Sequence, residues 1–106
     1  SGTTIGKIAA GISDNLATRS ALVAMKERRK LIIVPREAPY STPHLKAMFN
    51  LSEWGAVILP ASPGFYQSPR NIEDLIDFVV ARILDQLDVD HTLGKRWTGE
   101  EVPSED

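Results

Sequence analysis

The sequence contains no cysteine and no excess of positive charge. Without cysteine, the chain has no disulfide, thiolate metal site or cysteine nucleophile. Its 12 lysine and arginine residues are outnumbered by 14 aspartate and glutamate residues, and this net charge of −2 disfavours a protein that binds nucleic acid through phosphate contacts. The longest uncharged run, residues 54–69, is too short for a transmembrane helix and carries three prolines and two glycines.

The start of the chain, Ser-Gly-Thr-Thr, lacks an initiator methionine and a signal-peptide pattern. Together with the missing membrane span, this predicts a cytoplasmic protein. It also suggests that the chain is processed or is part of something longer.

The composition is that of an ordinary globular protein, with 42% hydrophobic and 25% charged residues in a length of 106, which favours one domain. Capping residues, proline and glycine breaks and apolar periodicity predict the elements. The first half of the chain is predicted to form a short helix and turn within residues 4–16, with Ser1, Thr3 or Thr4 as N-cap, then a helix over 15–29 and a strand over 31–34. The second half is predicted to form a helix from the N-cap Thr42 to 53, a strand over 56–59, a long helix over 72–87 and a polar tail over 91–106.

Strands alternating with helices predict parallel strands in a layered α/β fold. Both strand segments are continuous apolar runs, which are typical of strands buried on both faces. Each such strand needs a hydrogen-bonded neighbour on either side, and the sequence supplies only one. The pattern therefore predicts half of a fold, with residues 1–90 as part of a single domain.

Ligands of open parallel sheets bind beyond the carboxyl ends of the strands. Arg36 and Glu37 follow the first predicted strand, residues 64–66 follow the second, and residues 1–4 begin a helix whose free N–H groups favour a phosphate. Ordinary helix capping is the commoner role for such a Ser/Thr-rich start. From the residues alone, we expect an anion-binding end that accepts a phosphorylated ligand.

Charged side chains outside this edge have two interpretations each. Arg19 and Lys26 share one helix face, where they either bind an anion or are solvated surface charges. Arg36 and Glu37 lie between two prolines, and a charged pair at such a position needs partners or a task. The two side chains either form a mutual salt bridge, tether the loop to a helix, or have a functional role. Arg82 lies at the edge of an apolar stripe and either reaches inward or is a flanking residue.

The remaining polar and aromatic candidates are less specific. Tyr66 either packs in the core or offers its hydroxyl to a phosphate. Trp54 and Phe65 are expected in the core. His44 and His91 show no ligand-like spacing, and neither is assigned to a metal.

Several segments together resemble the flavin prenyltransferase family, the UbiX-type proteins that make prenylated FMN. The matching segments are Ser1–Thr4, Lys26–Arg29, Val34–Pro39, Gly55–Pro60, Pro63–Tyr66 and Asp77–Asp85, in the family's order and spacing. The match runs from Ser1 to Trp97 and corresponds to the C-terminal half of the family's Rossmann-like, three-layer parallel-sheet flavoprotein fold. The family's first strand and its Gly-Ala-Ser-Gly-type phosphate loop have no counterpart here.

The resemblance implies a role for each matching residue. Ser1, Thr4 and Arg36 would contact FMN, and Glu37 would be the acid/base residue as a dimethylallyl group joins N5 and C6 of the reduced flavin. The phosphate of dimethylallyl monophosphate would be bound by Tyr66, Arg82, Lys26 and Arg19. No metal is implied, and the sequence has no acidic cluster suited to Mg²⁺ near these positions.

The resemblance also implies an assembly and a product recipient. The family forms homo-oligomers built from trimers, often dodecamers, in which Trp97 would lie near the sites, and a UbiD-type decarboxylase receives the product. Two alternatives stay open. One is a flavin-dependent cysteine decarboxylase of the same superfamily, and the other is a non-catalytic flavin-binding module.

Overall fold

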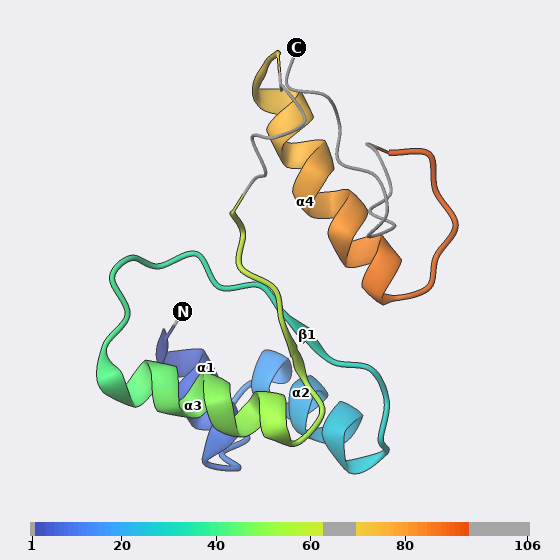
Figure 1. The fold of residues 1–106 in the computed structure, drawn as a ribbon. Coiled ribbons are helices and arrows are strands. Elements are labelled where there is room, and N and C mark those ends of the chain that lie inside the picture. The colour runs from blue at the N-terminus through green and yellow to red at the C-terminus, as the bar shows by residue number, and fades with distance from the viewer. Residues whose placement is uncertain (1, 63–69, 94–106) are drawn as a thin grey trace. The chain divides into compact units, whose positions relative to one another are not determined.

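The computed structural model describes residues 2–62 and 70–93, which fall in two compact units divided after Pro60 (Figure 1). The first contains α1 (Gly2–Ala9), α2 (Leu16–Lys26), β1 (Ile32–Ile33), α3 (Thr42–Glu53) and β2 (Val57–Ile58), and the second contains α4 (Ile72–Gln86). The predicted order of elements is confirmed, and each predicted helix and strand has its counterpart.

The two strands form a parallel pair connected through α3. Ile32 lies opposite Val57 and Ile33 opposite Ile58. The pair is shorter than the predicted runs over 31–34 and 56–59, because each strand has one hydrogen-bonded neighbour among the described residues.

The expectation that these strands are buried on both faces is wrong for the described chain. Ile33 and Ile58 pack against the helical core. Because successive side chains of a strand point to opposite faces, Ile32 and Val57 lie on the other face, and both are only half-buried. One face of the pair is therefore covered by the helices.

The core of the first unit is made where α1, α2 and α3 meet (Figure 1). Leu51 of α3 is fully buried, and Ile5 of α1 is 3% exposed. The apolar side of α1 packs mainly on α3. The start of α1 lies beside the segment that follows β1, where Glu37 accepts the Gly2 N–H. Trp54 was expected in this core but is 54% exposed, because it is the C-cap residue that ends α3.

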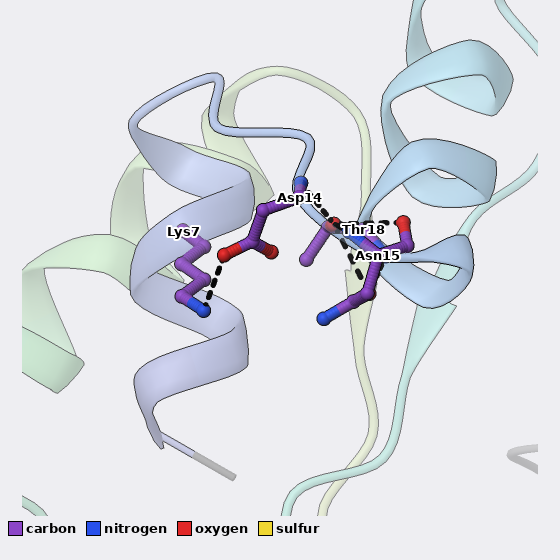
Figure 2. A network of polar contacts seen from close by, with 4 residues as sticks. All are labelled: Lys7, Asp14, Asn15 and Thr18. Carbon is purple, nitrogen blue, oxygen red and sulfur yellow. Dashed lines mark hydrogen bonds and ion pairs between the residues drawn. The ribbon is translucent and has the colours of Figure 1, made fainter.

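Polar contacts fix the turn between α1 and α2 (Figure 2). The Asn15 side chain accepts the backbone N–H of Thr18 at 2.8 Å, and the buried Thr18 hydroxyl accepts the N–H of Asn15 at 3.2 Å. This capping box begins α2 where the sequence predicts.

An ion pair between Lys7 and Asp14 joins α1 to the same turn (Figure 2). The Lys7 ammonium lies 2.7 Å from the Asp14 carboxylate, and its hydrogen bond and charge hold the pKa of Asp14 below its usual value. A lowered folded-state pKa means that the ion pair stabilises the fold at neutral pH and is lost as the pH falls through that pKa.

Three helix boundaries differ from the prediction. The first helix begins at Gly2, so Thr3 and Thr4 are helical residues and not caps, while Ser1 lies outside the described residues. The second ends at Lys26 and not at Arg29, because Arg28 is left-handed (φ 58°) and the Arg29 N–H bonds back to the Ala24 carbonyl.

The third helix is capped by Ser41, whose hydroxyl accepts the His44 N–H at 3.4 Å, and Thr42 is its first residue. In the second unit, Asn71 caps α4 in the same way. None of the described helices is long and apolar enough to cross a membrane.

Candidate functional site

A cavity of about 410 Å³ lies at the N-terminus of α1. The start of α1, the segment after β1 and the first turn of α3 form its walls, so residues distant in the sequence meet there. The lining residues are Gly2, Thr3, Val34, Pro35, Arg36, Glu37 and His44. Arg36 and Glu37, which the strand-end rule indicated, are thus among the residues that line this cavity.

Glu37 is attached to the end of α1. Its Oε1 atom accepts the backbone N–H of Gly2. This N–H has no partner inside the helix, and the helix dipole favours a negative group at this end. The predicted loop–helix tether is therefore confirmed, and the prediction of a phosphate at this helix end is weakened because Glu37 takes one of its free donors.

Arg36 lies beside Glu37 on the cavity wall and is exposed. Among the described residues it forms no ion pair with Glu37, so the mutual salt bridge is wrong. The site therefore combines a carboxylate held on a helix end with a neighbouring cation that is available to a ligand.

His44 and Gly2 approach each other closely on the third side of the cavity. Gly2 is buried, and a Cβ atom added there would overlap the His44 imidazole. Glycine therefore lets the α3 side chain lie against the α1 backbone, and any larger residue at this position would force the imidazole to move.

Gly2→Ala tests this packing. We expect the free energy of unfolding to fall by about 1–3 kcal/mol, the usual cost of an added methyl group in a packed site. Urea denaturation of the wild type, Gly2→Ala, His44→Ala and the double variant measures it. In the His44→Ala background, where the ring is gone, the alanine should cost much less; equal costs in both backgrounds would show that the ring does not set the requirement.

The predicted cations of α2 lie on its exposed side. Arg19 lines a second cavity of about 330 Å³, together with Ser13, Asp14, Asn15 and Leu16. Lys26 ends the helix and lines neither of these two cavities. The shared face predicted for Arg19 and Lys26 is present, and both side chains are exposed.

Thr4 and Arg82 complete the described candidates. Thr4 is half-buried in the first turn of α1 and does not line the cavity, whereas its neighbour Thr3 does. Arg82 belongs to the second unit, with its Nη1 atom 3.5 Å from Oδ2 of Asp85. Ser1, Phe65, Tyr66 and Trp97 lie outside the described residues.

The sequence analysis indicated residues 1–4, which include the cavity residues Gly2 and Thr3, but it missed His44. Strand ends indicated Arg36 and Glu37, but His44 comes from a helix whose packing on α1 no local pattern shows. Across residues 2–62 and 70–93, no group of three or more histidine, aspartate or glutamate side chains is arranged to hold a metal ion.

Comparison with known proteins identifies the family. A family model described as Flavoprotein matches residues 1–84. The flavin prenyltransferase UbiX of Thermoplasma acidophilum is 60% identical over 95 residues, which are 90% of this chain and 53% of that protein. The flavin prenyltransferase UbiX of Pseudomonas aeruginosa is 52% identical over 97% of this chain and 49% of its own length. The chain spans about half the length of the curated relatives it matches.

Solved structures agree in fold. The crystal structure of AnUbiX in complex with FMN and dimethylallyl pyrophosphate has a TM-score of 0.87 and 45% identity, over 94% of this chain and 53% of that one. A dodecameric FMN-dependent UbiX-like decarboxylase from Escherichia coli O157:H7 has a TM-score of 0.86 and 45% identity, over 92% of this chain and 53% of that one. The predicted Rossmann-like α/β flavoprotein fold is thus confirmed, and the chain belongs to the flavoprotein family.

Proposed function

We propose that this chain provides part of a flavin prenyltransferase, which transfers a dimethylallyl group from dimethylallyl monophosphate to N5 and C6 of reduced FMN. The observation that carries the proposal is the cavity in which Glu37 is held on the end of α1 beside Arg36, in a chain 60% identical to a flavin prenyltransferase. Reduced FMN, when bound, supplies the nucleophilic ring atoms.

The described residues fit a flavin. The cavity volume of about 410 Å³ is within the usual range of ligand pockets, and Arg36 adds a cation to its wall. Arg36 and Thr4, together with Ser1, would hold FMN. A similar structure solved with FMN supports FMN as the ligand.

Glu37 is proposed to move the protons of the reaction. A carboxylate anchored through one oxygen has a fixed position, and its second oxygen stays available for proton transfer. The tether to Gly2 therefore orients the acid/base group relative to whatever occupies the cavity.

The phosphate of the prenyl donor is assigned to Lys26, Arg19, Arg82 and Tyr66. A departing phosphate carries charge that cations stabilise, so these side chains would provide the leaving-group stabilisation without a metal. Dimethylallyl pyrophosphate in a related structure supports a prenyl phosphate as donor. The monophosphate is our assignment.

The assembly and the product recipient are also proposals. A similar structure is dodecameric, which supports a homo-oligomer built from trimers. The prenylated FMN would be passed to a UbiD-type decarboxylase, and the whole reaction would take place in the cytoplasm.

The test uses a protein of full family length that carries this sequence. We expect anaerobic incubation with reduced FMN and dimethylallyl monophosphate to give a flavin with the mass and spectrum of prenylated FMN. A parallel reaction with the pyrophosphate identifies the preferred donor. Unmodified flavin in both reactions would contradict the proposal, and decarboxylation of a cysteinyl peptide would instead indicate the cysteine decarboxylase activity.

A further inference from the structure

A chain of contacts leads from the backbone at Leu93 to Arg82 in the second unit. The Leu93 N–H donates to Nδ1 of His91 at 3.1 Å, and Nε2 of His91 lies 2.6 Å from Oδ1 of Asp85. The other carboxylate oxygen, Oδ2, lies 3.5 Å from Nη1 of Arg82. His91 therefore contacts Asp85, and Asp85 contacts Arg82, the residue that is assigned to the donor phosphate.

The hydrogen bonds define the tautomer of His91. Because Nδ1 accepts the Leu93 N–H, it carries no proton, so a neutral ring has its proton on Nε2. Nε2–H then donates to Oδ1 of Asp85, while Oδ2 of the same carboxylate faces Arg82. The imidazole therefore holds the carboxylate in one rotamer.

Burial falls along this chain of contacts. The side chain of His91 is 6% exposed, that of Asp85 is 13% exposed, and that of Arg82 is 31% exposed. The inner two groups are thus well restrained, while the guanidinium at the outer end reaches solvent. A guanidinium has five N–H donors, so an ion pair through Nη1 leaves others for an anion.

We propose that Asp85 and His91 are positioning residues that hold the Arg82 guanidinium ready for the phosphate of the prenyl donor. This inference rests on the proposed function. An arginine that is free to rotate loses side-chain entropy when it binds, and a restrained one has lost much of it beforehand. The expected effect of losing the restraint is a rise of about tenfold in the KM for dimethylallyl monophosphate.

The experiment compares His91→Phe with His91→Gln in the full-length protein. Phenylalanine keeps a ring but cannot donate to Asp85, whereas the glutamine amide can. We expect His91→Phe to raise the KM for dimethylallyl monophosphate about tenfold with little change in the Kd for FMN, and His91→Gln to stay near the wild type. Asp85→Asn, which keeps the side-chain size, should resemble His91→Phe.

A double-mutant cycle shows whether the effect passes through Arg82. His91→Phe should add nothing to the KM in an Arg82→Ala background; a full tenfold rise there would overturn the inference. A ¹⁵N NMR spectrum with the proton of His91 on Nδ1 would overturn it too, independently of activity. If Arg82→Ala leaves the KM unchanged while the enzyme works, the assignment of Arg82 is wrong and the inference with it. If the wild type makes no prenylated flavin, the proposed function itself fails.

Discussion

Replacing Glu37 with glutamine is expected to lower the rate of prenyl transfer by about 10²–10⁴-fold while FMN still binds. Glutamine has nearly the same shape and cannot accept or release a proton near neutral pH. Its amide oxygen can still accept the Gly2 N–H that Glu37 accepts in the wild type. The substitution therefore removes proton transfer and keeps the tether.

Single-turnover formation of prenylated FMN and a separate FMN titration measure the two effects. Glu53→Gln, at the exposed end of α3 and away from the cavity lining, is the matched control and should be unchanged. A rise in the Kd for FMN as large as the loss in rate would contradict the assigned role. Glu37→Ala, which also removes the tether, should additionally weaken the anchoring of the loop to α1.

Local patterns predicted the elements because capping and breaking residues act over a few residues. Asn15 begins α2 as expected, and Gly11 ends the first helical segment with a positive φ of 76°. The cap of α3 was displaced by one residue because Ser41 and Thr42 both carry a suitable hydroxyl, and only the backbone decides which one precedes the helix. The order of elements then followed from these boundaries.

Burial was harder to predict than element type. The apolar strands indicated a sheet covered on both faces, yet the described chain covers one face. Trp54 was expected in the core because it is large and apolar, but the end of α3 leaves it exposed. Which faces are covered depends on the number of neighbouring elements, and residue type alone does not contain that information.

The candidate site was predicted only in part, because local sequence does not show which distant segments pack together. The carboxyl end of β1 indicated Arg36 and Glu37, and the structure places both on the wall of the cavity at the start of α1. The approach of His44 to Gly2 depends on how α3 packs on α1, and the link from His91 to Asp85 depends on a turn after α4. Contacts of this kind appear only once the backbone is in place.

Lys26→Gln is expected to lower kcat/KM for dimethylallyl monophosphate by about 10²-fold. Lys26 is the last residue of α2, on the same face as Arg19, and its exposed ammonium is available to an anion. Removing one cation from a departing phosphate destabilises the transition state, in which charge develops on the leaving group. FMN binding should be unaffected because Lys26 does not line the cavity beside Glu37.

The matched control is Lys30→Gln, an exposed lysine that lies beyond the end of α2. Both substitutions remove one positive charge from the same region, so general electrostatic attraction of an anionic substrate changes equally in the two variants. Only a direct contact with the phosphate distinguishes them, and kcat/KM measured at two salt concentrations separates it from screened, long-range attraction. If the two variants lose activity to the same extent, and high salt abolishes the loss, Lys26 acts as a surface charge and has no contact with the phosphate.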